Sequence, residues 1–243
     1  MITSIPKSAI FYPETDGKPT AENTIQLMWI EMVHVELDVQ YIHRDDVFVA
    51  ADLFWYPVAG KSKIVQAPDI FVVFGRPKID RGSYQQWLEG GIPPQVVFEI
   101  YSPSNAVKEI DAKFSFYQRY GVEEYYLIDP YKKTVKGYRR RKDDLIEIRK
   151  IAEWTSPRLG IRFVKENGDL YIIGPDGHRF LKPTERIGQE KELAEKERAE
   201  KERERADKEQ ERAEKERERA DKEALAGKLR ELGIDPDTVI KRT

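Results

Sequence analysis

An acidic side chain lies inside an apolar stretch of this sequence. Residues 95–104 read Gln-Val-Val-Phe-Glu-Ile-Tyr-Ser-Pro-Ser, which is rich in the β-branched and aromatic residues that favour strands. Successive strand side chains point to opposite faces, so Val97, Glu99 and Tyr101 share one face. A run that is apolar on both faces is typical of a central strand in a covered sheet. A carboxylate there is costly without a partner, a proton or a metal, so Glu99 needs an explanation.

A second acid and a lysine complete a candidate site. Asp69 follows a proline at the start of another apolar strand, expected over residues 67–74. After the Glu99 strand we expect a helix over about residues 105–120, capped near Ser104, with Lys113 on the flank of its apolar stripe. Asp69 and Glu99 could supply hard oxygen ligands to Mg²⁺, and Lys113 could orient a water or stabilise developing negative charge. Each has a structural alternative: a turn aspartate, a buried ion pair and a snorkelling lysine.

These motifs occur in an order that is more specific than any one of them. The series consists of Pro68-Asp69, Glu99-Ile100-Tyr101-Ser102-Pro103-Ser104, Lys113, Tyr117, Gly121-Val122-Glu123-Glu124-Tyr125 and Asp129-Pro130. It resembles the putative restriction endonuclease family of the PD-(D/E)XK nuclease superfamily, over about residues 10–180. The superfamily lysine belongs two residues after the glutamate, where this chain has Tyr101, so Lys113 would have to substitute for it.

The resemblance implies a fold and an activity. The fold would be a mixed α/β (α+β) restriction-endonuclease-like core, with a mixed central sheet flanked by helices. The activity would be hydrolysis of DNA phosphodiester bonds with Mg²⁺ or Mn²⁺, and Asp69 and Glu99 would be the catalytic metal ligands. Because Tyr101 replaces the motif lysine, a catalytically inactive nucleic-acid-binding module with the same fold is the alternative.

Other candidate residues surround this core motif. Accessory positions are Glu31 on an expected first helix, Asp52 in an expected strand over residues 47–55, Tyr101 and Tyr117, although surface or capping positions explain the two acids better than metal binding does. A basic cluster could hold DNA phosphates, or could be an ordinary solvated hairpin. It contains Lys132, Lys133, Arg139, Arg140 and Arg141. The three histidines show no zinc-ligand spacing.

The composition changes near residue 184, so we expect a nuclease domain over residues 1–183 and a charged helical tail over residues 184–243. Ala199, Ala206, Ala213 and Ala220 recur every seven residues among Glu, Lys and Arg. A heptad seam needs two apolar positions and this tail has one, so a single solvated helix competes with a weak coiled coil. A coiled coil would make the tail an interaction arm and the protein a homodimer.

The composition limits the kinds of site and the cellular location that we expect. The 243 residues contain no cysteine, which excludes disulfides, thiolate metal sites and a cysteine nucleophile. No apolar run approaches the roughly 20 residues of a membrane span, so we expect a cytoplasmic protein without a membrane partner. Further strands are expected near residues 125–128, 134–139, 145–151, 159–163 and 170–173.

Overall fold

The computed structural model describes residues 10–14, 23–103, 107–233 and 235. Its contacts divide the chain into two compact units, Met1–Glu185 and Arg186–Thr243. Within the described residues, no helix is both long enough and apolar enough to cross a membrane.

The first unit is built on a mixed six-stranded sheet with the order β1-β3-β5-β6-β7-β8. Its strands are β1 (Val47–Ala51), β3 (Ile70–Phe74), β5 (Val96–Ile100), β6 (Glu124–Asp129), β7 (Thr134–Arg141) and β8 (Asp144–Glu147). The β5–β6 pair is parallel, whereas the other neighbours run antiparallel. Two small sheets accompany it, formed by β2 (Trp55–Tyr56) with β4 (Tyr84–Gln85) and by β9 (Arg162–Glu166) with β10 (Asp169–Ile173). The expected mixed α/β class is therefore confirmed.

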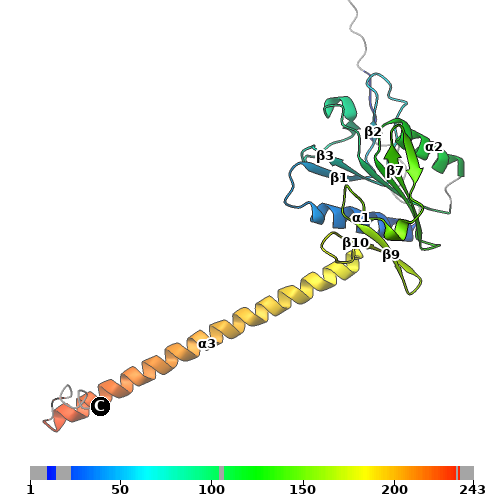
Figure 1. Ribbon diagram of the computed structural model, residues 1–243. Coiled ribbons are helices and arrows are strands. Elements are labelled where there is room, and N and C mark those ends of the chain that lie inside the picture. The colour runs from blue at the N-terminus through cyan, green and yellow to red at the C-terminus, as the bar shows by residue number, and fades with distance from the viewer. Residues whose placement is uncertain (1–9, 15–22, 104–106, 234, 236–243) are drawn as a thin grey trace, which may run out of the picture. The chain divides into compact units, whose positions relative to one another are not determined.

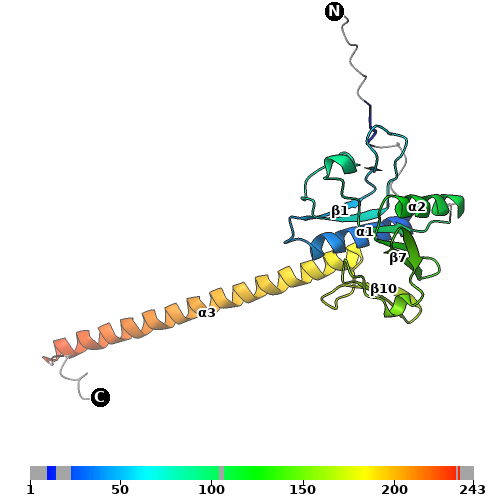
Figure 2. The same cartoon turned by 45° about the horizontal axis from the view of Figure 1, so that its top comes forward.

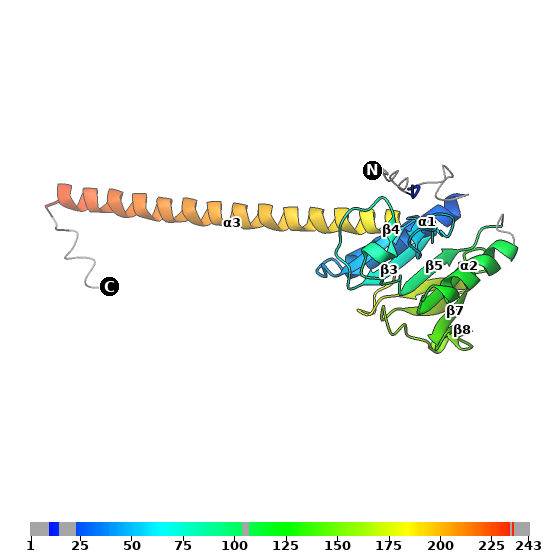
Figure 3. The same ribbon diagram turned by 90° about the horizontal axis from the view of Figure 1, so that it is seen from above.

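Helices and the small sheets cover both faces of the central sheet (Figures 1 and 2). One core packs α1 (Thr24–Gln40) and the β9–β10 pair against one face, which we call the α1 face. A second core packs α2 (Val107–Arg119) and the β2–β4 pair against the opposite face, which we call the α2 face. Figure 3 shows α2 lying along β5 and the strands that follow it. Strand β5 is buried at every position, because both of its faces are covered.

The first helix forms as expected. Asn23 caps it by accepting the backbone N–H of Gln26 at 2.9 Å. Trp29, Met32, Val33 and Leu37, which share one face at helical spacing, are buried as the sequence pattern predicts. Ile25 at the start of that stripe is 42% exposed, and the polar side chain of Gln26 is buried instead.

Two other expectations need correction, and one falls outside the described residues. The strand expected over residues 47–55 ends at Ala51, because Asp52 has a positive φ of 50° and the chain turns before β2. Val107 does not join the buried stripe of α2 and is 74% exposed. The start of that helix at residues 105–106 and its cap at Ser104 lie outside the described residues. Gly121, with a φ of 96°, ends the helix region as expected.

The second unit consists mainly of α3 (Pro183–Glu231), which begins just before the unit boundary. Its side chains form several i,i+4 ion pairs, such as Lys208 with Glu204 at 2.5 Å. Each such pair adds roughly 0.2–0.5 kcal/mol to helix stability. No residue of α3 is buried, so the helix rests on local interactions rather than on a core. Two 3₁₀ turns, Gln86–Leu88 and Ile151–Glu153, complete the secondary structure of the first unit.

Candidate active site

Glu99 is buried in the middle of the sheet and has two partners from one helix. It is 4% exposed and points from β5 toward the α2 face. The Nζ atom of Lys113 lies 2.7 Å from its Oε2 atom, and the Tyr117 hydroxyl donates to its Oε1 atom. Residues four apart in a helix share a face, so α2 presents Lys113 and Tyr117 together. The expected proximity of Lys113 to Glu99 is therefore present in the structure.

Asp69 lies beside this pair on the neighbouring strand. It immediately precedes β3, whose first residue, Ile70, is in register with Phe98 of β5. Its Oδ2 atom accepts the backbone N–H of Ile100 at 2.6 Å, which ties it to the strand that carries Glu99. Burial and the nearby Glu99 charge raise the pKa of Asp69 well above its ordinary value, against the opposing effect of Lys113. The two carboxylates are thus electrostatically coupled.

Lys113 is held as an ammonium by this acidic environment. Its burial acts to lower the pKa, but the charges of Glu99 and Asp69 outweigh that effect and raise the pKa above its ordinary value. At neutral pH the group therefore carries a proton and a positive charge. This state suits electrostatic stabilisation of an anion and excludes Lys113 as a general base near pH 7.

A small hollow opens beside Glu99, with Lys113 and Tyr125 in its lining. Its volume of about 10 Å³ is close to the space that one water molecule needs. The buried hydroxyl of Tyr125 has no hydrogen-bond partner among the described residues. A buried donor of this kind is costly unless a ligand or water completes its bonding. One of the residues that line this solvent-sized hollow therefore has a polar group without a partner among the described residues.

A family match accompanies this geometry. The model of the Uma2 family, described as "Putative restriction endonuclease", matches residues 34–162, which is more than half of the chain. The chain belongs to the Uma2 family. The matched segment contains Asp69, Glu99 and Lys113.

The fold also resembles that of a solved structure. A solved structure of a putative nuclease belonging to DUF820 from Anabaena variabilis is similar at 16% sequence identity with a TM-score of 0.43. The similarity covers 59% of this chain and 79% of that one. Among curated proteins, none matches the chain significantly.

The four accessory candidates of this Uma2 chain lie at different distances from Glu99. Glu31 is exposed on α1, which covers the other face of the sheet from Glu99, so the structure does not bring it to the site. Asp52 is exposed, and its backbone N–H lies 3.2 Å from the carbonyl oxygen of Asp69. Tyr101 follows β5, and its ring lies 5.9 Å below the Lys132 ammonium. Only Tyr117 among these four contacts Glu99 directly.

The expected basic cluster falls into two groups. Lys132 and Lys133 occupy the turn between β6 and β7, where Lys133 pairs with Asp169 at 2.6 Å. Residues 139–141 lie toward the far end of β7. Arg140 there donates to the carbonyls of Gln118 and Val122 at 2.6 and 2.7 Å, so it ties the end of α2 to β7. The cluster is therefore not one phosphate-binding surface, because the sequence neighbours are spread along a strand.

Sequence reasoning missed two polar groups near the site. Gln26 reaches from the α1 face and donates to the Ile100 carbonyl at 3.2 Å, within the segment that Asp69 also contacts. The only feature of the sequence that could have indicated this role is that Gln26, a polar residue, is spaced to lie on the apolar face of the helix. Tyr125 was visible only as one more aromatic residue in a strand, since nothing local indicates that its hydroxyl reaches the Glu99 hollow.

The donor set of this Uma2 domain fits a hard divalent cation. Among the described residues, no group of three or more His, Cys, Asp and Glu side chains gathers at one place. Two carboxylates suffice for Mg²⁺, which keeps several of its waters and is often bound through one or two acids. Burial and, after it, the charge of Glu99 raise the pKa of Asp69, and a cation held by the two carboxylates would offset both effects.

Proposed function

We propose that the protein is a divalent-metal-dependent DNA endonuclease that hydrolyses phosphodiester bonds. The observation that carries this proposal is a buried glutamate, Glu99, coupled to a second carboxylate, Asp69, and to the ammonium of Lys113. Two acids and one cation, of which Glu99 and Lys113 line a solvent-sized hollow, are suited to phosphoryl chemistry, in which positioning and charge stabilisation supply most of the catalysis. Membership in a family described as restriction endonucleases supports the same reaction class.

Asp69 and Glu99 would hold the Mg²⁺ or Mn²⁺ ion. When bound, such an ion lowers the pKa of a water and offsets charge on the phosphodiester. The protein orients these two ligands through backbone and side-chain contacts. Asp69 is fixed by the Ile100 N–H, and Glu99 is fixed by the Tyr117 hydroxyl.

Lys113 supplies the positive charge that the superfamily lysine would supply from the position of Tyr101. Its protonated ammonium stabilises negative charge that develops on a phosphate oxygen. The Tyr125 hydroxyl lines the same hollow, so it can donate to or accept from a water located there. Together these groups bind and orient the reacting partners without themselves accepting the proton at neutral pH.

The proposal assigns a different function to each of the two parts of the chain. We assign hydrolysis to residues 1–183, and to residues 184–243 the part of a helical spacer or self-association arm that would give a homodimer. The alanine repeat and the exposed, charged surface of α3 support this division.

The decisive experiment uses the full chain and supercoiled plasmid DNA. Nicking or linearisation should require Mg²⁺ or Mn²⁺, stop with EDTA, and fall by at least about 10²-fold in Glu99→Gln, the loss expected for one electrostatic stabiliser. Glu31→Gln is the matched control, because Glu31 is an exposed glutamate on the other side of the sheet. Cleavage that survives both EDTA and Glu99→Gln would exclude the proposed site.

The second candidate function is a nucleic-acid-binding module without catalysis. It is favoured by Tyr101 at the motif position and by the ion pair that already engages Glu99. This candidate requires salt-dependent DNA binding with no metal-dependent turnover. A single-turnover assay with enzyme in excess separates the two, since any Mg²⁺-dependent product that Glu99→Gln abolishes excludes the inactive module.

A further inference from the structure

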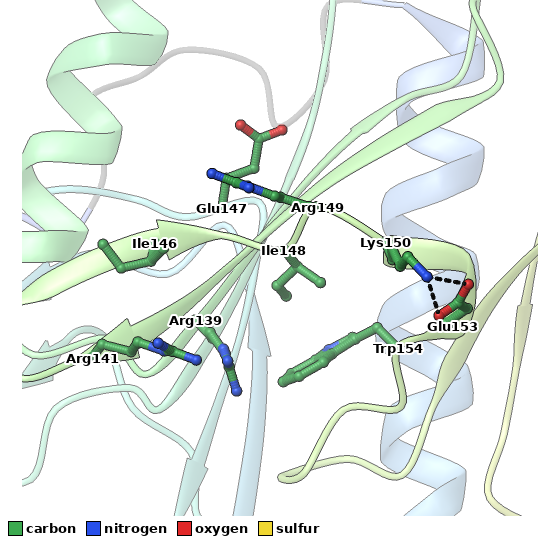
Figure 4. A pocket seen from close by; sticks show the side chains of 9 residues that line it. All are labelled: Arg139, Arg141, Ile146, Glu147, Ile148, Arg149, Lys150, Glu153 and Trp154. Carbon is green, nitrogen blue, oxygen red and sulfur yellow. Dashed lines mark hydrogen bonds and ion pairs between the residues drawn. The ribbon is translucent and has the colours of Figure 1, made fainter.

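A second hollow lies at the outer edge of the sheet, over β7 and β8. Its volume is about 530 Å³, within the 300–1,000 Å³ typical of ligand pockets. Its lining contains two more cations than carboxylates, and one of the carboxylates, Glu153, already pairs with Lys150 at 3.1 Å. Figure 4 shows the indole of Trp154 extending toward Arg139, with Ile148 above the two side chains. The hollow thus combines positive charge with an aromatic wall.

Arg139 and Arg141 of this hollow have no acidic partner among the described residues. Within the part of the chain that the structure describes, neither Arg139 nor Arg141 forms an ion pair. Arg139 instead places its guanidinium 5.5 Å from the centre of the Trp154 ring. In Figure 4, Glu147 points away from both of these side chains. Unpaired arginines beside an aromatic ring recognise phosphate and planar groups well.

Trp154 is held in place by a buried network rather than by packing alone. Its indole N–H donates to the Tyr126 hydroxyl at 2.9 Å, and that hydroxyl donates to Glu124 at 2.9 Å. Glu124 is itself 3% exposed and accepts from the Ser156 hydroxyl at 2.5 Å. The ring is therefore a preorganised surface, which lowers the entropy cost of stacking a planar group on it.

The hollow continues past the Arg139–Trp154 pair. A neighbouring depression of about 470 Å³ shares Arg139 and Trp154 with the first. It adds Arg140 and Arg158 but also Glu123 and Glu124, and Arg158 pairs with Glu123 at 2.6 Å. Two depressions that share one aromatic–arginine pair match a chain of repeating units better than a single small molecule. A polyanion with planar groups, in other words a strand of nucleotides, fits this arrangement.

This groove is on the opposite face of the sheet from Glu99. Tyr138 packs on α2, with its ring centre 4.9 Å from that of Phe114, so its neighbour Arg139 points to the α1 face. Trp154 also belongs to the core on the α1 face. Nucleic acid bound in the groove would therefore occupy a place separate from the site of hydrolysis.

We propose that the groove formed by Arg139, Arg141 and Trp154 binds a segment of single-stranded nucleic acid. The choice of nucleic acid over other polyanions rests on the proposed nuclease function, but the groove itself is independent of Asp69 and Glu99. Phosphates contact the arginines, and one base stacks on Trp154. Single strands fit because a duplex does not present its bases for stacking.

The test measures binding of the full chain to a fluorescein-labelled thymidine oligonucleotide of about 15 nucleotides, a length that spans typical single-strand site sizes. EDTA is present throughout, so cleavage does not interfere. Arg139→Glu and Arg141→Glu should each weaken binding at least about fivefold and reduce its salt dependence. Lys165→Glu makes the same charge change on the exposed surface of β9 and should leave the affinity unchanged.

A second readout reports the stacked base. The oligonucleotide should quench part of the tryptophan emission, and Trp154→Phe should remove that part, while far-UV circular dichroism shows whether each variant is folded. The inference is overturned if Arg139→Glu and Arg141→Glu bind like Lys165→Glu. It is also overturned if thymidine monophosphate or a duplex of equal length binds as tightly as the oligonucleotide. Plasmid cleavage with Mg²⁺ is measured separately. A groove that does not bind the oligonucleotide would therefore leave the proposed hydrolysis standing, and a protein that does not cleave plasmid could still bind the oligonucleotide in the groove.

Discussion

The Nζ atom of Lys113 lies 2.7 Å from Oε2 of Glu99, joining the middle of α2 to the middle of β5. Both side chains are largely withdrawn from solvent, with 17% and 6% of their areas exposed. Removing one member of such a pair leaves the other charge buried without compensation, which is more damaging than removing both. The pair is therefore a structural link as well as a part of the candidate active site.

Lys113→Met should destabilise the fold by about 3 kcal/mol, because Glu99 remains buried without its cation. The double variant Lys113→Met/Glu99→Gln should recover much of that loss. Urea denaturation in EDTA measures both values, and Lys108→Met, an exposed lysine of the same helix, should change little. Additive losses in the double variant would show that the two side chains do not interact in solution.

Asp69→Asn should alter the pH dependence of stability. The pKa of Asp69 is raised on folding, so its favourable contribution is present below the ordinary value of about 4 and is lost as pH rises through the raised pKa. In EDTA the asparagine variant should therefore become increasingly more stable than wild type above about pH 4. Each unit of raised pKa corresponds to about 1.4 kcal/mol.

Thermal unfolding of wild type and Asp69→Asn across that pH range measures the effect. Asp111→Asn, at an exposed position of α2, is the matched control and should track wild type. A stability difference between wild type and Asp69→Asn that stays constant with pH would contradict the raised pKa of Asp69.

Mg²⁺ should stabilise the folded protein if Asp69 and Glu99 hold it. At a concentration of about 100 times the dissociation constant, binding to the native state adds about 2.7 kcal/mol. The rise in Tm should disappear in Asp69→Asn and Glu99→Gln and persist in Asp111→Asn, at matched ionic strength. An equal rise in all variants would place the ion elsewhere.

Arg140→Met should reduce stability rather than remove a DNA contact. Arg140 donates to backbone carbonyls at the end of α2, and each buried acceptor left unpaired costs about 1–3 kcal/mol. Arg141→Met, which changes an exposed neighbour, should unfold at the wild-type urea concentration. Equal midpoints for the two variants would indicate that the Arg140 contacts contribute nothing.

Ala206→Pro should break α3 without affecting the first unit. Proline in an exposed helix interior costs about 3 kcal/mol relative to alanine, so far-UV circular dichroism should show lost helix. Near-UV signals of the aromatic core should melt at an unchanged temperature, since the tryptophans and tyrosines all lie in the first unit. Ala206→Ser serves as the control for helix content. A lower Tm of the near-UV transition would show that the two units stabilise each other.

Local sequence patterns were sufficient to predict the central strand, the charged helix and the family of this protein. The alternation around Glu99 predicts a buried strand with one inward acid, and the structure has β5 buried at every position. The charged tail predicts a helix, because its i,i+4 pairs are contacts between near neighbours in the chain. The ordered motifs pointed to the family that the Uma2 match shows.

Only the tertiary structure decided how distant groups meet. Asp52 leaves its strand by a backbone turn, Gln26 of α1 reaches the Ile100 carbonyl, and Tyr125 lines the Glu99 hollow. The basic residues that follow one another along β7 alternate between faces, so Arg140 supports α2 while Arg139 reaches Trp154. Sequence periodicity assigns a residue to a face of its own element. Which elements cover that face, and which atoms lie within bonding distance, depends on packing between segments far apart in the chain.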